Sequence, residues 1–97
     1  MQTTSEERAI TFAKIDSLRK HMLLSKTQMA RLLGVSRVTY HNWQSAGQLP
    51  TRGSGYTKKV LREMLRIMVD HSWPTPQVVA MTPDERLEEL QRLIEVV

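Results

Sequence analysis

Two short helices joined by a tight turn are predicted for the segment SKTQMARLLGVSRVTYHNWQSAG. Ser25 is followed three residues later by Gln28, which is the spacing of a capping box at a helix start. Gly34 supplies the left-handed residue that ends such a helix, and Ser36 can cap a second helix that runs to about Ala46. So small a connection requires the two helices to cross steeply, which is the geometry of a helix-turn-helix.

An amphipathic helix is predicted ahead of this pair, from Glu6 to Leu24. Ser5 is a suitable N-cap, and the acids Glu6 and Glu7 suit the positive end of a helix. Apolar residues recur at spacings of three and four, as one buried face requires. These residues are Ala9, Ile10, Phe12, Ala13, Ile15, Leu18, Met22 and Leu23.

Two further helices are predicted after the pair. One runs from Lys58 to about His71 with Thr57 as its cap, and the other starts at Thr82 in the sequence TPDE. The prolines of SWPTP break the chain between them, and residues 77–81 form either a short helical turn or an extended segment. The loop QLPTRGSGYTKK is a flexible connector or a basic arm. The expected fold class is therefore all-α, a compact bundle of about five helices.

Charge is segregated along the chain. From Ser17 to Arg62 there are nine Lys or Arg residues and no Asp or Glu, whereas five acids stand against two arginines from Pro74 to Val97. A solvated helical face normally mixes both signs, so this one-sign window indicates a polyanionic partner. Nucleic acid is the leading candidate, and the alternative is a chance excess of cations on a basic protein.

Size and composition exclude several classes of protein. A chain of 97 residues holds one small domain with a short appendage. Its apolar runs are too short to cross a bilayer, and its polar, acidic start is unlike a signal peptide, so we expect a cytoplasmic protein without a membrane partner. The sequence has no cysteine, which excludes disulfides and thiolate metal sites. Small chains without such links often gain stability by oligomerising.

The segment KTQMARLLGVSRVTYHNWQS resembles the helix-turn-helix of the phage Cro and C1 repressor family, also called the Xre family. In that family a small residue sits in the middle of the first helix and a glycine four residues later makes the turn, and Ala30 and Gly34 match. The family's hydrophobic positions are matched by Val35, Tyr40 and Trp43. The segment QSAGQLP resembles the end of the family's recognition helix, where a glycine ends the helix and a proline follows. The glycine-rich loop after it is longer and more basic than the family norm. The resemblance covers about residues 18–50.

This resemblance implies a lambda-repressor-like DNA-binding domain. It implies double-stranded DNA as the partner, bound by a homodimer at a palindromic or repeated operator. It also implies a bacterial cell as the setting, with the chain encoded by the bacterium or by a phage.

Helical periodicity separates the second helix of the motif into two faces. Residues three and four apart share a face, so Tyr40 and Trp43 are expected in the core. By the resemblance, the base-contacting residues are Arg37, Val38, His41 and Asn42. Arg37 can pair with O6 and N7 of guanine, Asn42 with N6 and N7 of adenine, and Val38 can meet a thymine methyl. The alternative for each is an exposed residue that adds nothing to specificity.

Contacts to the DNA backbone are expected at helix starts and in the basic loop. At the start of the first motif helix, free backbone N–H groups and the helix dipole attract a phosphate. The expected residues are Lys26, Thr27, Gln28, Thr39, Ser45, Arg52 and Lys58. For Gln28 the alternative is that the capping box engages its side chain entirely.

The predicted organisation is a helix-turn-helix DNA-binding domain over residues 1–72, with the motif at 26–45, and a linker with a final helix over 73–97. That helix carries an apolar stripe of Leu87, Leu90, Leu93, Ile94 and Val97. The stripe either packs back on the core or forms a dimer seam. A dimer is favoured, because a single recognition helix gains affinity from a two-fold partner.

These features predict a sequence-specific transcriptional regulator, most simply a repressor, that occupies operator DNA as a dimer. We expect no enzyme activity, metal, cofactor or small-molecule ligand, because the histidines lack partners at ligand spacing and no phosphate loop or nucleophile elbow is present. Two alternatives stay open. One is a DNA-recognition subunit of a larger assembly, such as a phage terminase small subunit, and the other is an antitoxin with a helix-turn-helix.

Overall fold

The computed structural model describes residues 10–50 and 54–94, and every regular element within these ranges is an α-helix. The helices are α1 (Phe12–His21), α2 (Lys26–Leu32), α3 (Arg37–Ala46), α4 (Gly55–Asp70), α5 (Pro76–Ala80) and α6 (Pro83–Leu93). The predicted all-α class is confirmed. For residues 77–81 the sequence allowed either a short helical turn or an extended segment, and the structure forms the helix α5 there. None of these helices has the length and apolar character needed to cross a membrane.

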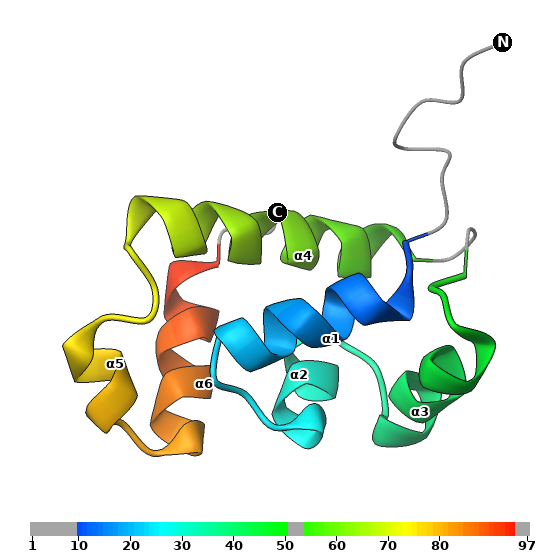
Figure 1. The fold of residues 1–97 in the computed structure, drawn as a ribbon, viewed down its shortest axis with the longest axis horizontal. Coiled ribbons are helices and arrows are strands. Elements are labelled where there is room, and N and C mark those ends of the chain that lie inside the picture. Colours follow the sequence, from blue (N-terminus) through cyan, green and yellow to red (C-terminus); the bar gives the residue numbers. More distant parts are fainter. Residues whose placement is uncertain (1–9, 51–53, 95–97) are drawn as a thin grey trace, which may run out of the picture.

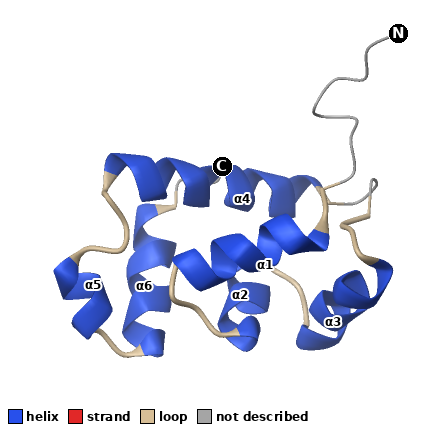
Figure 2. Ribbon diagram, in the orientation of Figure 1, coloured by secondary structure: helices blue, strands red, loops and turns tan. Residues whose placement is uncertain are grey.

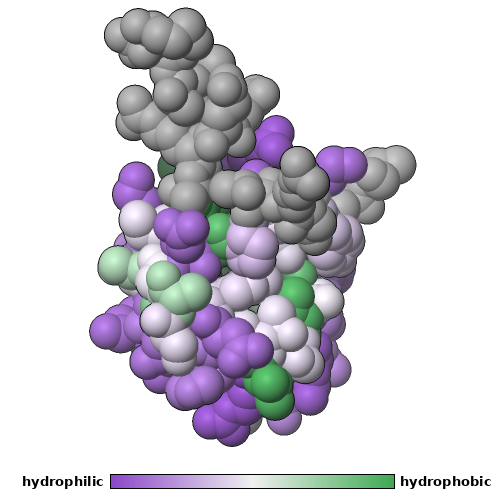
Figure 3. All heavy atoms as spheres, turned by 90° about the vertical axis from the view of Figure 1, so that its right-hand side faces the viewer, coloured by the Kyte–Doolittle hydropathy of each residue, from purple (hydrophilic) through white to green (hydrophobic). Residues whose placement is uncertain are grey.

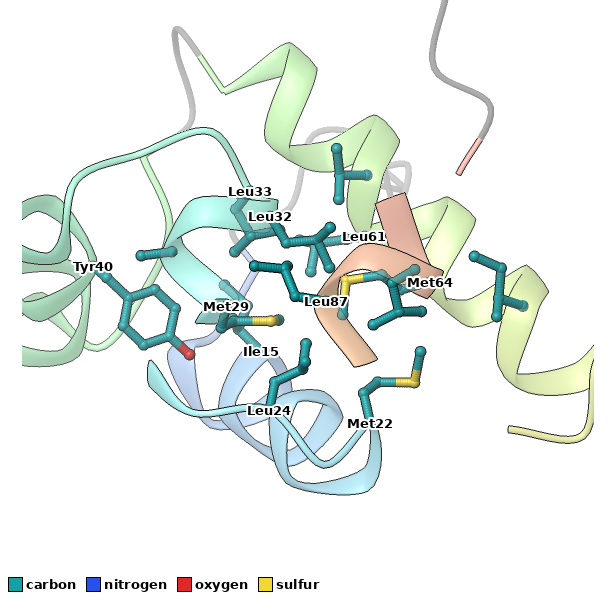
Figure 4. Close-up of a cluster of buried hydrophobic side chains, with 14 of the residues drawn as sticks. Ile15, Met22, Leu24, Met29, Leu32, Leu33, Tyr40, Leu61, Met64 and Leu87 are labelled. Atoms are coloured by element: carbon teal, nitrogen blue, oxygen red, sulfur yellow. The ribbon is translucent and has the colours of Figure 1, made fainter. Parts of the chain in front are cut away.

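All six helices contribute to one hydrophobic cluster. α4 runs along the top in Figure 1, α1 lies below it, and α3 and the α5–α6 pair lie on opposite sides of α2. Short loops join α1 to α2, α2 to α3, α4 to α5 and α5 to α6 (Figure 2). Figure 4 shows the centre of the cluster, where Ile15 of α1, Met29 of α2 and Leu87 of α6 meet. Trp73, Val78, Leu87 and Leu90 belong to the same cluster, so residues on both sides of position 72 share one core.

The first helix begins later than its apolar spacing predicts. α1 starts at Phe12, because the residues just before it pair with the segment that leaves α3. The Phe12 N–H donates to the Gly47 carbonyl at 2.9 Å, and the Leu49 N–H donates to the Ile10 carbonyl at 2.8 Å. The predicted helix is therefore wrong at positions 10 and 11, and it is also wrong at its other end, because α1 stops at His21 and not at Leu24. Its expected cap, Ser5, and its first-turn acids lie outside the described residues.

The α2–α3 pair agrees closely with its prediction. The Gln28 N–H donates to Ser25 Oγ at 3.1 Å and the Ser25 N–H donates to Gln28 Oε1 at 3.0 Å, which completes the capping box. Gly34 follows α2 with a φ of 76°. Ser36 caps α3 by accepting a hydrogen bond from the Thr39 N–H at 3.0 Å. Local capping signals therefore determine this turn.

Gly34 occupies a place in the turn that suits no side chain. Its φ lies in the left-handed region, and a Cβ there would stand 2.9 Å from Cε2 of Tyr56 on α4. We expect Gly34→Ala to lower the free energy of unfolding by about 1–2 kcal/mol, which is the typical cost of a non-glycine residue in this conformation. Urea unfolding measures the loss. Gly55→Ala is the control, because no atom lies within 4 Å of a Cβ there. If both changes lowered the free energy of unfolding by the same amount, the turn would not require glycine at position 34.

α4 begins earlier than predicted, with Ser54 and not Thr57 in the N-cap position. The Ser54 hydroxyl donates to the Pro50 carbonyl at 2.8 Å. Thr57 is buried in the first turn of α4, and its hydroxyl donates to the Leu33 carbonyl at 3.1 Å. The predicted cap is wrong because the Thr57 hydroxyl donates to a carbonyl at the end of α2, whereas a cap would accept a hydrogen bond from a backbone N–H of α4. This bond holds the start of α4 against the end of α2.

The C-terminal helices fold back onto the core. Thr75 caps α5, and Thr82 with Glu85 forms a capping box at the start of α6, as the sequence predicts. Leu87 and Leu90 of α6 are buried in the common cluster. The Arg66 guanidinium of α4 donates to a backbone carbonyl at the end of α6, at 3.0 Å. The end of α6 is therefore tied to α4.

Candidate nucleic-acid interface

The inner face of α3 is part of the core. Tyr40 and Trp43 are 1% and 6% exposed. The Tyr40 ring meets Phe12 edge to face with centroids 5.1 Å apart, and it lies 6.1 Å from the Trp43 ring. Such aromatic pairs stabilise a core beyond the burial of their surface. The prediction that Tyr40 and Trp43 are core residues is confirmed.

The outer face of α3 is open to solvent. It carries the four predicted base-contacting residues, which are all exposed: Arg37, Val38, His41 and Asn42. Within the described parts of the chain, no hydrogen bond or ion pair engages the side chains of Arg37, His41 or Asn42. Figure 3 looks onto the α3 side and shows a mostly hydrophilic surface with isolated hydrophobic residues. These side chains are thus available to a partner, and their contacts with bases stay predictions.

Gln44 belongs to the same outer face, although it is not among the residues predicted from the sequence to contact DNA. It follows Arg37 by seven residues, or about two helical turns, and it is exposed. The Lys26 ammonium donates to Gln44 Oε1 at 3.4 Å, which brings the start of α2 to this face. The Gln44 amide keeps its two N–H donors without a partner among the described residues. The seven-residue spacing from Arg37 was a signal that could have identified Gln44.

Gln28 is engaged inside the chain. It is 6% exposed, and its Nε2 donates to Asp84 Oδ1 at 3.0 Å while its Oε1 accepts the Ser25 N–H. The capping box therefore engages the oxygen of the amide, and Asp84 engages its nitrogen. Gln28 ties the start of α2 to the start of α6. Thr27 beside it is exposed and stays a candidate for a backbone contact.

The other predicted backbone-contacting residues lie on α3 and at the start of α4. On α3, Ser45 is exposed, and Thr39 is half-buried with its Oγ1 accepting the Ser36 hydroxyl at 3.0 Å. Lys58 is half-buried in the first turn of α4. Arg52 lies outside the described residues.

Tyr56 also lies beside the α2–α3 turn, although its place in the sequence does not predict this position. It is 57% exposed, and its ring lies close to Gly34 in the turn that precedes α3. This contact places the start of α4, and Lys58 with it, next to the start of α3. No periodicity connects Tyr56 with Gly34, so only the folded chain reveals the neighbourhood.

One acid lies beneath α3 and is compensated by its neighbours. Asp16 of α1 accepts hydrogen bonds from Arg19 Nε at 2.7 Å and from the Tyr40 hydroxyl at 3.5 Å, and Lys20 Nζ lies 3.7 Å from its second oxygen. The hydrogen bond from Arg19 holds the pKa of Asp16 below its ordinary value. Burial raises the pKa of Tyr40 to about 12. The cluster therefore joins α1 to α3 without an unpaired negative charge.

Asp16 gives stability a dependence on pH. Its folded-state pKa is lower than its unfolded value, so its ionisation stabilises the fold above about pH 4, and this contribution is lost as the pH falls through the folded pKa. We expect the free energy of unfolding to fall less steeply below about pH 5 in Asp16→Asn than in the wild type. Urea unfolding at several pH values measures both slopes.

The control for this prediction is Glu88→Gln, which changes an exposed carboxylate on α6. It should leave the slope of the wild type unchanged. Identical slopes for Asp16→Asn and the wild type would show that the Asp16–Arg19–Tyr40 cluster adds no stability through charge.

The residues predicted for dimerisation are covered by their own chain. Leu87 and Leu90 are 4% and 0% exposed in the core, and Leu93 and Ile94 are half-buried against it. Val97 lies outside the described residues. The described part of the stripe thus packs back on the core, which is the other alternative for this helix. Dimerisation itself stays a prediction.

The chemistry of the α3 face suits a polar, negatively charged partner. Arg37 offers a planar set of N–H donors, Asn42 and Gln44 offer amides, and Lys26 adds a positive charge. Among the described residues, no group of His, Asp and Glu is arranged to hold a metal ion. Comparisons of the chain with protein-family models, curated proteins and solved structures find no match. The geometry of this face is therefore the observation that bears on function.

Proposed function

We propose that this chain is a sequence-specific double-stranded DNA-binding protein that regulates transcription, most simply as a repressor occupying operator DNA as a dimer. The observation that carries the proposal is the outer face of α3, where exposed hydrogen-bonding side chains stand on a helix whose other face is locked in the core. Base readout requires polar side chains that are free to bind and a rigid element that presents them.

The charge around α3 supports a polyanionic partner. The stretch from Ser17 to Arg62 contains nine cationic residues and no acid. Two acids approach the α2–α3 pair from outside this stretch: Asp16 is paired with Arg19, whereas Asp84 accepts a hydrogen bond from the neutral Gln28 amide and keeps its charge, which leaves the cations in excess. Phosphates near α2 and α3 would therefore meet net positive charge.

The dimensions of a helix support entry of α3 into the major groove. An α-helix with its side chains is about 10–12 Å across and the groove is about 12 Å wide. In this placement the start of α3 meets the bases, so Arg37 would bind guanine and Asn42 would bind adenine. Lys26, Thr27 and Lys58 would then lie near phosphates and fix the orientation without reading sequence.

Selection of bound duplexes from a random pool tests the proposal. We expect enrichment of one motif with two-fold symmetry or a direct repeat, and an affinity that falls as salt rises. The variant Arg37→Ala/Asn42→Ala, selected in parallel, should enrich no motif at those base positions. A wild-type chain that enriches no duplex, or that binds single strands as tightly as duplexes, would refute the proposal.

A further inference from the structure

A shallow apolar groove of about 680 Å³ lies between α1 and α4. Its floor and walls include Ala13 and Leu18 of α1 and Leu61, Leu65 and Met68 of α4. Lys14 and His21 line it as well, and no acid does. The chain therefore leaves an apolar hollow with the positive charge of Lys14 on its α1 wall.

An apolar ridge runs beside this groove. Leu65 and Val69 lie one turn apart on α4, and they are 48% and 73% exposed. The other large exposed hydrophobic residues of the described chain stand singly on different elements: Val38 on α3, Tyr56 at the start of α4 and Val79 on α5. Scattered exposed residues are ordinary, whereas a ridge next to an apolar groove is typical of an interaction site.

We infer that the α1–α4 face, defined by this groove and ridge, is the surface through which two copies of the chain associate. A two-fold contact seats the Leu65–Val69 ridge of each copy in the groove of the other, because groove and ridge lie side by side on the same face. An isologous interface needs such a self-complementary patch. The inference rests on the proposed function only in its requirement that two copies act together.

The charges on α4 determine the direction of packing. The first half of the helix carries Lys59 and Arg62, and the helix ends with Asp70, whose carboxylate also lies 3.6 Å from Arg66 Nη1. Antiparallel packing of the two α4 helices brings Asp70 of one copy toward the basic start of α4 in the other. Parallel packing would place like charges together, which disfavours association.

The position of this face is compatible with DNA binding by α3. α4 lies along one edge of the molecule and α3 lies toward the opposite edge (Figure 1). A two-fold axis perpendicular to α4 within the α1–α4 face therefore keeps the α3 helices of both copies on the same side of the dimer. Leu87 and Leu90 of the α6 stripe are buried in their own chain, so they do not compete for this role.

Sedimentation equilibrium without DNA, over micromolar to millimolar concentrations, tests the inference. The two variants are Val69→Lys on the α1–α4 face and Val79→Lys on α5, which exchange valines that are 73% and 56% exposed. We expect the wild type and Val79→Lys to form dimers with similar dissociation constants. Val69→Lys should raise the constant by at least about tenfold, because antiparallel packing places its charge near the basic start of α4 in the other copy. Circular dichroism verifies that both variants stay folded.

Three results would overturn the inference: a monomeric wild type, a dimer that Val69→Lys leaves intact, or equal weakening by both variants. The experiment is independent of duplex selection. A dimer that selects no duplex supports this inference and refutes the DNA proposal, whereas a monomer that selects one does the reverse.

Discussion

Replacing Leu90 with alanine is expected to lower the free energy of unfolding by about 2–5 kcal/mol. Leu90 is 0% exposed and belongs to the cluster that all six helices share. Truncation removes apolar contacts and leaves a cavity that the surrounding helices fill only in part. Urea unfolding followed by circular dichroism measures the loss. A single transition in the wild type would also show that α6 unfolds together with the rest of the chain.

The matched control is Gln91→Ala, which changes the exposed neighbour on the same helix. It should change the free energy of unfolding by no more than about 0.5 kcal/mol.

The oligomeric mass of the Leu90→Ala variant distinguishes a packed α6 from an α6 that joins two copies. Leu90→Ala should keep the mass of the wild type, because this leucine packs within its own chain. A shift to monomers without loss of stability would show that α6 forms a seam between copies.

Replacing Arg37 with alanine is expected to weaken binding to the selected duplex by about 1–3 kcal/mol, or roughly five- to 150-fold. Binding to a random duplex should change far less, because non-specific binding depends on phosphates. Arg37 is exposed, so its removal should leave the fold intact. Fluorescence anisotropy with the selected and the scrambled duplex measures both affinities at one fixed salt concentration.

Lys58→Ala is the control for this prediction. It should weaken binding to both duplexes alike and reduce the slope of log affinity against log salt by about one unit. Equal losses on the two duplexes in Arg37→Ala would show that Arg37 binds a phosphate. The assignment of Arg37 to base readout would then be wrong.

The α2–α3 pair could be predicted from sequence because its determinants are local. Ser25 and Gln28 reach each other within one turn, and Gly34 supplies the conformation that ends the helix. The two faces of α3 follow from helical periodicity alone, which separated the buried Tyr40 and Trp43 from the exposed residues. The same periodicity places Gln44, two turns after Arg37, on the exposed face.

Features that depend on distant partners could not be predicted in this way. Thr57 looks like a cap until α2 is known to bring the Leu33 carbonyl within reach. The start of α1 depends on pairing with residues near Gly47. Leu23 takes a positive φ of 64° after α1, a conformation that its residue type does not indicate. Tyr56 beside Gly34 and Asp84 beside Gln28 likewise depend on how separate helices pack.

Because α3 is attached to the rest of the chain at both ends, the side chains of its outer face can change while the helix stays in place. Its start is fixed by the Ser36 cap, its end is tied to Phe12 through the Gly47 carbonyl, and the Tyr40 hydroxyl reaches Asp16 beneath it. The outer side chains take no part in these attachments. They can therefore be exchanged without moving the helix, so one scaffold can present different contact surfaces, and a partner meets a helix already in place at little cost in ordering.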